Sequence, residues 1–368
     1  MIDKESRRAV TLAAALTAGM MSAPYPATAD AIITLTGPTS NAGTIDLSTA
    51  DGLYGGPVTV GGVTGYSLWG LLGGANASSP TSPIYGAITT TTPAGDNGKN
   101  AILRYYVLAT AANGSQSLIS LGEIDPNFTG PTPPAIPTDL VTFSGNTASL
   151  TFSLSGAAGR DLTNLTSLQL LSVPALPALP AGSSAPESTS VILAGNVSFP
   201  GSYTFQGSDP QNVPVITETV NNDTYTGPPF FALIDPSDPN ILNQYVVTAG
   251  TDGYEVLFSL AELDPAFGAS TTIPQVDLVP YLDTAGTLPM PDGIARIITP
   301  VDTPFAHGRW VSNLDMIEVD AVPEPATGAL LMSGLIGMAM GAFRRRRYSL
   351  IWARVSTPKV TPPYPNDS

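Results

Sequence analysis

Residues 245–267 read YVVTAGTDGYEVLFSLAELDPAF and residues 106–128 read YVLATAANGSQSLISLGEIDPNF, so one pattern occurs twice without a gap. Each copy has two β-prone runs around an Asp-Gly or Asn-Gly pair, which favours the tight turn of a β-hairpin. A serine then precedes a short apolar helix that ends at Asp-Pro. The stretch predicts a hairpin followed by a capped helix in each of two matching halves.

Two further blocks occur in both halves and in the same order. Residues 64–72 align with residues 226–234, and residues 159–173 align with residues 308–322. Repeated blocks in a constant order indicate repeated structural units. We therefore expect the chain to contain two tandem copies of one module.

The two modules are predicted at residues 31–173 and 187–322, joined by a Pro-rich, semi-rigid linker at residues 174–186. Opening strands are expected at residues 32–37 and 191–195, each ended by a glycine. The chain has 36 Gly and 36 Pro in 368 residues and only 12% charged residues, which fits turn-rich β structure. The predicted fold class is α+β, mainly β.

The first 29 residues have the order of a secretory signal peptide. Arg7 and Arg8 precede an apolar run at residues 9–23, and the small residues Ala27 and Ala29 follow it. This order predicts export by the secretion machinery and cleavage after Ala29 by signal peptidase. The paired arginines also resemble a twin-arginine signal, so both export routes stay open.

An uncharged, mostly apolar run at residues 326–343 ends abruptly at Arg344-Arg345-Arg346-Arg347. A helix of about 18 residues is roughly 27 Å long, enough to cross the hydrocarbon core of a bilayer. An arginine cluster at its end stays on the cytoplasmic side. We therefore expect a transmembrane helix that anchors the exported chain in the inner membrane.

The motif Val322-Pro323-Glu324-Pro325 stands directly before this helix. Over residues 323–347, the order of Pro-Glu-Pro, apolar helix and arginine cluster resembles the PEP-CTERM sorting signal of exopolysaccharide-producing Gram-negative bacteria. The resemblance implies recognition by an exosortase, a membrane protease that cuts near Pro-Glu-Pro and releases or re-anchors the ectodomain at the cell surface. A plain single-pass anchor predicts the same topology without the cut. Residues 348–368 extend beyond the family pattern and have no assigned role.

The part between the two ends is strongly acidic. Residues 31–325 hold 5 basic and 25 acidic side chains, a balance near −20. Nucleic acids are bound through Lys and Arg clusters, so this charge excludes a nucleic-acid-binding function. It suits a soluble extracellular body.

Four short blocks of the second module resemble the molybdopterin-binding domain of the sulfite oxidase family. They are Tyr225-Thr226-Gly227, Asp252-Gly253-Tyr254, Arg296-Ile297-Ile298-Thr299-Pro300 and Arg309-Trp310-Val311. The first module keeps a degenerate version with Thr64-Gly65, Asn113-Gly114 and Gly159-Arg160. The resemblance implies two tandem sulfite-oxidase-like modules, with Arg309, Arg296 and His307 as candidate cofactor contacts.

Catalysis in that family depends on a cysteine thiolate bound to molybdenum, and this chain has no cysteine. The corresponding stretch, residues 218–223, offers Asn and Asp, which cannot replace a soft thiolate without changing the metal chemistry. We therefore expect no catalytic residues and no cofactor. A molybdopterin-dependent periplasmic oxidoreductase is the alternative.

Other candidate sites have plainer structural interpretations. His307 is the single histidine, and a loop position beside Gly308 favours backbone contacts over a catalytic triad. The acidic turn at residues 235–240 lacks the glycine and terminal glutamate of a calcium loop, so no metal site is expected. Arg309, repeated as Arg160, is expected in an internal ion pair or a retained anion contact.

Two carboxylate pairs recur at the same place in both modules, Glu123 with Asp125 and Glu262 with Asp264. Such pairs can serve acid–base chemistry, but their repetition at helix ends favours capping and turn formation.

The sequence thus predicts an exported, exosortase-sorted envelope or matrix protein with a structural or ligand-binding ectodomain. The exopolysaccharide of the matrix is its candidate partner. An adhesin using the aromatic pairs Tyr105-Tyr106 and Phe230-Phe231 is a third possibility, although core packing explains these pairs as well.

Overall fold

The computed structural model describes residues 30–50, 55–74, 83–91, 101–126, 128, 139–152, 157–173, 185–205, 213–271, 276–283, 293–300 and 307–322. The predicted signal peptide, transmembrane helix, arginine cluster and C-terminal tail lie outside these ranges, as does the linker up to residue 184. Among the described residues, none belongs to a helix long and apolar enough to cross a membrane. The chain divides into a compact unit at residues 1–321 and a second unit at residues 322–368, of which only Val322 is described.

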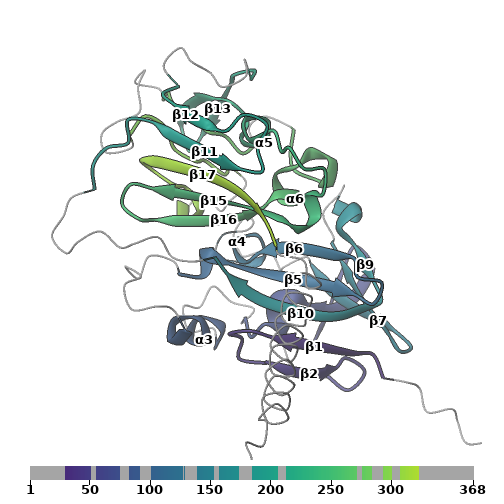
Figure 1. Cartoon of the computed structure of the whole chain (residues 1–368). Coiled ribbons are helices and arrows are strands. Elements are labelled where there is room, and N and C mark those ends of the chain that lie inside the picture. The colour runs from purple at the N-terminus through teal and green to yellow at the C-terminus, as the bar shows by residue number, and fades with distance from the viewer. Residues whose placement is uncertain are drawn as a thin grey trace, which may run out of the picture. The chain divides into compact units, whose positions relative to one another are not determined.

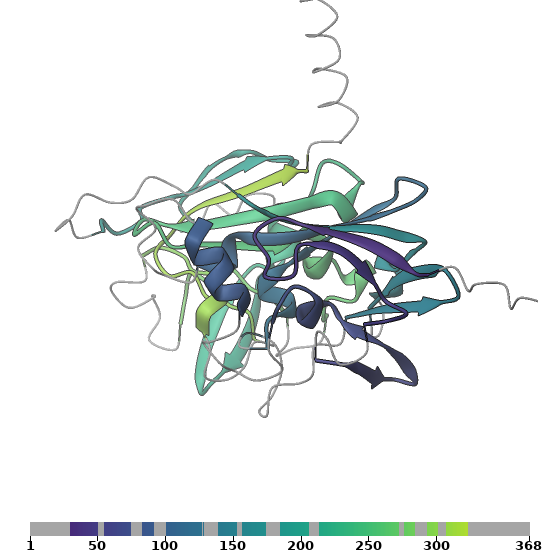
Figure 2. The same ribbon diagram turned by 90° about the horizontal axis from the view of Figure 1, so that it is seen from below.

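Two five-stranded sheets form the centre of the first unit, and their strands follow the same order (Figure 1, Figure 2). The first sheet has the order β2-β1-β10-β5-β6, and the second has the order β12-β11-β17-β15-β16. The strands of the first sheet are β1 (Ile32–Thr36), β2 (Gly43–Asp46), β5 (Tyr105–Ala111), β6 (Gln116–Ser120) and β10 (Leu165–Ser172). Those of the second are β11 (Val191–Gly195), β12 (Gly201–Tyr203), β15 (Gln244–Gly250), β16 (Glu255–Ser259) and β17 (Leu314–Ala321).

The strand pairing of the two sheets matches in detail. In each sheet the opening strand runs parallel to the closing strand, β1 with β10 and β11 with β17, and the other neighbours are antiparallel. An irregularity in register lies at the same point of both, opposite the end of β5 and of β15. The opening strands expected at residues 32–37 and 191–195 are confirmed as β1 and β11.

The halves differ beyond these sheets. In the first half, a further sheet has the order β3-β4-β7-β8-β9, formed by β3 (Pro57–Val60), β4 (Val63–Ser67), β7 (Leu140–Ser144), β8 (Thr147–Thr151) and β9 (Leu162–Thr163). Among the described residues of the second half, the further sheet is the two-stranded hairpin of β13 (Ile216–Val220) and β14 (Asp223–Gly227), next to isolated bridges at Leu278 and Leu282.

Short helices connect the strands. The α-helices are α2 (Leu68–Leu71), α3 (Pro83–Thr91), α4 (Leu121–Ile124), α5 (Phe230–Ile234) and α6 (Leu260–Leu263). The 3-10 helices are η1 (Ala101–Arg104), η2 (Ala157–Arg160), η3 (Ile241–Asn243), η4 (Pro265–Phe267) and η5 (His307–Arg309). The prediction of a mainly β chain is confirmed.

Residues 245–267 fold as the sequence predicts. β15 and β16 form a hairpin whose turn contains Gly253, at φ +79°, and the Tyr254 N–H donates to Asp252 Oδ1 at 2.9 Å. Ser259 then caps α6 in a capping box with Glu262, and α6 ends at Asp264. Reciprocal satisfaction of two free N–H groups explains why a helix of one turn starts at this serine.

The hydrophobic core draws on both halves. One cluster of buried side chains includes Leu35 and Leu168 from the first sheet and Leu193 and Ile317 from the second. The strands contribute alternate residues to it, as the burial pattern of β1 shows. Burial of these apolar side chains supplies the main driving force for folding.

A glycine ends each opening strand because no side chain fits there. Gly37 has φ +100° and Gly195 has φ +79°. A Cβ atom would lie 2.1 Å from the Leu170 carbonyl oxygen in the first case and 2.0 Å from the Val319 carbonyl oxygen in the second. Only glycine therefore allows the chain to turn away from the sheet at these two points.

Replacing Gly195 with alanine should destabilise the protein by about 3 kcal/mol or more, because a backbone clash adds to the cost of a left-handed alanine. Gly253→Ala is the matched control, since Gly253 has the same φ of +79° with open space around it. The control should cost only about 1 kcal/mol in urea unfolding. Equal losses for the two variants would show that close packing against β17 is not the constraint.

Candidate functional site

Among the described residues, side-chain hydrogen bonds and ion pairs are most concentrated where the two halves meet. The edge strands β6 and β16 lie next to each other, and a one-turn helix follows each, α4 and α6 (Figure 1). Ser120 and Ser259 are the N-cap residues of these helices, and each side chain accepts the N–H of the glutamate three residues later, at 3.1 Å. Local capping therefore fixes Glu123 and Glu262 at equivalent positions.

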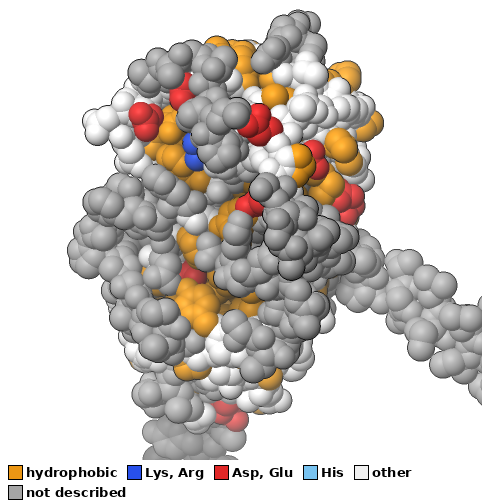
Figure 3. All heavy atoms as spheres, turned by 90° about the vertical axis from the view of Figure 1, so that its left-hand side faces the viewer, with side chains coloured by type: hydrophobic (Ala, Val, Ile, Leu, Met, Phe, Trp, Pro, Cys, Tyr) orange, Lys and Arg blue, Asp and Glu red, His pale blue; other side chains and the backbone are white. Residues whose placement is uncertain are grey.

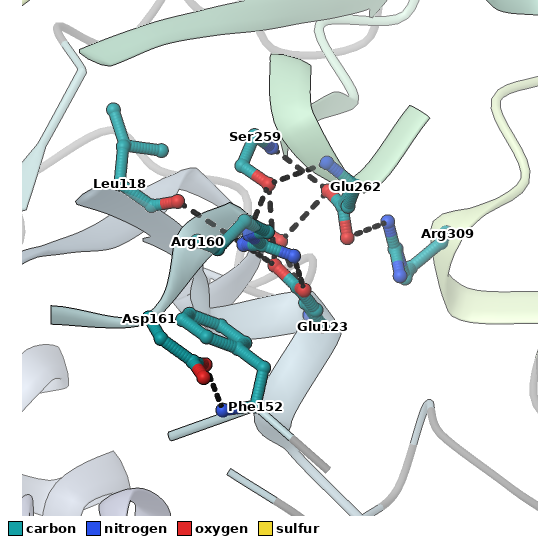
Figure 4. A network of polar contacts seen from close by, with 9 residues as sticks. Leu118, Glu123, Phe152, Arg160, Asp161, Ser259, Glu262 and Arg309 are labelled. Carbon is teal, nitrogen blue, oxygen red and sulfur yellow. Dashed lines mark hydrogen bonds and ion pairs between the residues drawn. The ribbon is translucent and has the colours of Figure 1, made fainter. Parts of the chain in front are cut away.

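An arginine from the same half pairs with each glutamate (Figure 4). Arg160, at the end of η2, forms two contacts with Glu123, of which Nη2 to Oε2 is 2.9 Å. Arg309, at the end of η5, has Nη2 at 3.0 Å from Glu262 Oε2. All four side chains are at most 10% exposed. The structure thus gives both arginines an internal ion pair, one of the two roles expected for them.

Hydrogen bonds then cross between the halves in a reciprocal way. Ser120 Oγ donates to Glu262 Oε1 at 3.0 Å, and Ser259 Oγ donates to Glu123 Oε2 at 3.2 Å. Arg160 Nη2 also reaches Ser259 Oγ at 3.3 Å. Each glutamate therefore bonds its own arginine and the serine of the other half. We call Ser120, Glu123, Arg160, Ser259, Glu262 and Arg309 the junction network.

Aromatic rings lie against both arginines of the network. The guanidinium carbon of Arg160 lies 4.3 Å from the ring centre of Phe152, and that of Arg309 lies 4.5 Å from the ring centre of Phe258. These rings cover the flat faces of the cations while the N–H edges bond carboxylates.

Two more contacts join the halves beside the network. The rings of Tyr106 and Tyr245 stack with centres 5.4 Å apart. Arg104 Nε lies 2.8 Å from Glu255 Oε2, and both side chains are buried. Polar and apolar contacts thus hold the same junction together.

Burial changes the proton affinity of two carboxyl groups at the junction. The pKa of Asp139, the residue before β7, is raised to about 8 by desolvation and then by the charge of Glu123, against the opposing effect of Arg160. The pKa of Glu262 is raised to about 7 by desolvation, which exceeds the lowering effect of Arg309. The charge of Glu123 also raises the pKa of both groups, and that of Arg160 lowers both.

Two of the expected cofactor contacts, Arg309 and Arg296, have different partners. Arg309 belongs to the junction network. The guanidinium carbon of Arg296 lies 5.8 Å from the ring centre of Tyr225 and 5.3 Å from that of Trp310. His307 is in η5, and its side chain is outside the described residues.

These positions do not fit a molybdopterin. An anionic cofactor needs cationic side chains that point into an open site. Arg309 instead forms an ion pair with Glu262, and Arg296 packs against two aromatic rings. The chain also has no cysteine that could supply a thiolate to molybdenum. No reaction step can therefore be assigned to such a cofactor here.

The remaining candidates are also structural. Asp264 Oδ1 accepts the Ala266 N–H at 2.8 Å, and Asp125 accepts the Tyr85 hydroxyl, so both cap turns or bind neighbouring elements. Tyr106 and Phe230 are buried, which removes them as sugar-stacking surfaces. Within the described ranges, His, Cys, Asp and Glu side chains form no group of three that could hold a metal ion.

Sequence reasoning found the capped helices and the paired arginines but missed the links between the halves. Asp139 carries no motif, and its burial depends on the position of β7. The signal available in the sequence is the repetition of serine, glutamate and arginine in both halves, which indicates equivalent positions in two repeated units.

Comparison with known proteins locates the sorting signal. The model of the PEP-CTERM protein-sorting motif matches residues 321–347. No curated protein matches the chain. The match supports an exported protein that is anchored at the membrane before processing, with an exosortase as the processing enzyme. The resemblance of the two modules to sulfite oxidase stays a prediction.

Replacing Arg309 with methionine should destabilise the protein by about 3–5 kcal/mol, because Glu262 would stay buried without its cation. Glu187→Gln, at an exposed position, is the control and should change the stability by no more than about 0.5 kcal/mol. Urea unfolding of the two variants measures both values. A loss at Arg309 as small as that of the control would show that the ion pair is not part of the stable fold.

Proposed function

We propose that this chain is an envelope or extracellular-matrix component whose exported body is a non-catalytic scaffold of two copies of one module. An exosortase removes its C-terminal signal, and the body then acts at the cell surface or in the matrix. The match of residues 321–347 to the PEP-CTERM motif carries this proposal.

The place where the motif begins supports a clean separation of body and signal. β17 is a central strand of the second sheet and ends at Ala321, where the match starts. Val322 is still buried, and Pro323 follows. A cut near Pro323-Glu324-Pro325 therefore leaves every strand of the body intact.

The matching sheets support the inference of a duplicated module. Strand order, the position of the parallel pair and the register irregularity are the same in both. The junction network repeats the same three residue types in each half. Whether the module is related to sulfite oxidase is a separate proposal, which rests on the short sequence blocks alone.

The charge distribution supports a scaffold over an enzyme for anionic substrates. Arg104, Arg160 and Arg309 are buried and paired with carboxylates. Acidic side chains are spread over the face shown in Figure 3, where cationic side chains occupy a small area. Such a surface repels anionic polymers, so a matrix polysaccharide that binds it would be neutral or cationic.

Removal of both prolines of the sorting motif, as Pro323→Ala with Pro325→Ala, should block processing in the native host. The variant should stay at full length in the membrane fraction, because exosortase recognition needs the motif. Pro362→Ala with Pro363→Ala makes the same chemical change in the C-terminal tail and is the control. Immunoblots of membrane, surface and medium fractions give the result.

Equal processing of the two proline variants, or full processing in a strain without exosortase, would contradict the sorting function. A processed body that is retained in the periplasm would contradict the surface or matrix location alone.

The cofactor-free body should contain neither molybdenum nor pterin when the protein is purified from its own host. Elemental analysis and the fluorescence of oxidised pterin measure both per chain. Near-stoichiometric amounts would overturn the scaffold proposal and favour the oxidoreductase alternative.

A further inference from the structure

Both halves expose the edge of a sheet at equivalent places. β3 is the terminal strand of its sheet, and β13 is the outer strand of the hairpin with β14. Thr59 of β3 bonds Thr64 through the two hydroxyls at 2.8 Å. Thr217 of β13 bonds Thr226, the residue aligned with Thr64, in the same way at 2.9 Å. Edge strands present main-chain N–H and C=O groups to which another strand can add, so natural proteins protect them.

The edge of the second half offers several such groups. The turn residues Asn221 and Asn222 have φ of 55° and 74°, as in a two-residue type I′ hairpin. The residues that flank such a turn bond each other, and the bonding then alternates along the strand. Val215, Thr217 and Thr219 therefore direct their N–H and C=O groups away from β14. No backbone hydrogen bond from another described segment reaches these groups. We call these three residues the β13 edge.

The corresponding edge of the first half is protected. The turn at Gly61 and Gly62 follows Val60 directly, so by the same alternation Pro57 and Thr59 face away from β4. Pro57 stands where the second half has Val215, and it has no N–H to donate. Short length and an edge proline are two of the devices that keep other strands away. The chain thus closes one of two equivalent edges and leaves the other open.

The side chains along the β13 edge are exposed and uncharged. Val215 is 41% exposed, and Thr217 and Thr219 are exposed as well. Glu218 is the single charged residue of residues 213–221, and it is buried on the other face of the hairpin. The body as a whole has a charge balance near −20. Two copies of this acidic body can therefore approach along residues 213–221 without opposed surface charges.

We propose that the β13 edge is a self-association site, to which the β13 edge of a second copy adds as an antiparallel strand about a two-fold axis at Thr217. In this register Thr217 faces the partner's Thr217, and Thr219 faces the partner's Val215. Each of these pairs exchanges two N–H···O bonds. Glu218 faces the partner's Ile216, so within residues 213–221 the pairing opposes no like charges.

This contact names a partner for the proposed scaffold and rests on that function. An isologous pairing uses the same surface of both copies, which suits an edge whose outward groups match their own antiparallel image. A single strand pair is smaller than a standard interface of roughly 1,200 Å² or more, so the association is weak and reversible. A weak contact is effective where many copies are held close together, as in a matrix.

The test is crosslinking of the full chain, in a mild nonionic detergent, through single introduced thiols. The chain has no cysteine, so Thr217→Cys supplies the one reactive thiol of that variant. Thr59→Cys, at the aligned and exposed position of the protected edge, is the matched control. At about 0.1 mM protein, a short bismaleimide should join two copies of the Thr217→Cys variant. The dimer should be about tenfold more abundant than for Thr59→Cys, because β3 has fewer outward donors.

A second variant tests the main-chain bonds themselves. Thr219→Pro removes an outward N–H and leaves the bonds between β13 and β14 in place. The two-fold axis repeats this loss in both copies. Crosslinking through Thr217→Cys should therefore fall about tenfold when Thr219→Pro is added. Urea unfolding shows whether the double variant folds, and if it does not, the comparison of the two thiol variants decides.

Two results would overturn self-association at this edge. One is equal crosslinking of Thr217→Cys and Thr59→Cys, as association through the apolar residues 326–343 would give. The other is the absence of a dimer at this concentration. In host cells, mass spectrometry of the crosslinked product should identify a second copy of the chain, and any other protein in its place would contradict the proposal. All these outcomes leave processing at the sorting motif unchanged, so they are distinguishable from a failure of the sorting function.

Discussion

The reciprocal bonds between Ser120 and Glu262 and between Ser259 and Glu123 are the interaction on which the rest of this structure depends. Each serine has two tasks, because it caps its own helix and binds the glutamate of the other half. Local helix formation and docking of the halves are thereby coupled. Two arginines complete the arrangement, and aromatic rings exclude water from it.

This arrangement also explains how an acidic exported body uses its few cations. The chain places Arg104, Arg160 and Arg309 in its interior, where each pairs with a carboxylate. Buried ion pairs rarely add much stability over apolar packing, but breaking one of them is costly. Their value here lies in specifying which surfaces of the two halves meet.

Sequence patterns were sufficient for local elements and for the sorting signal. The Asp252-Gly253 turn, the cap at Ser259 and the Pro-Glu-Pro signal depend on neighbouring residues, so their chemistry is visible in the chain. Repetition also indicated the two matching sheets. The burial of Asp139 and the bonds across the junction depend on residues far apart in the chain, and no local pattern encodes that proximity. Arg296 and Arg309, which short motifs suggested as cofactor contacts, lie in different surroundings, and no local pattern encodes those surroundings either.

The central claim is that the two halves form one body through their junction. Scanning calorimetry of the full chain tests it most directly, by comparing the calorimetric with the van't Hoff enthalpy of unfolding. The account predicts a single transition with equal enthalpies, which moves to lower temperature when Glu123 or Glu262 is replaced. Two separate transitions, each sensitive to changes in one half only, would contradict it.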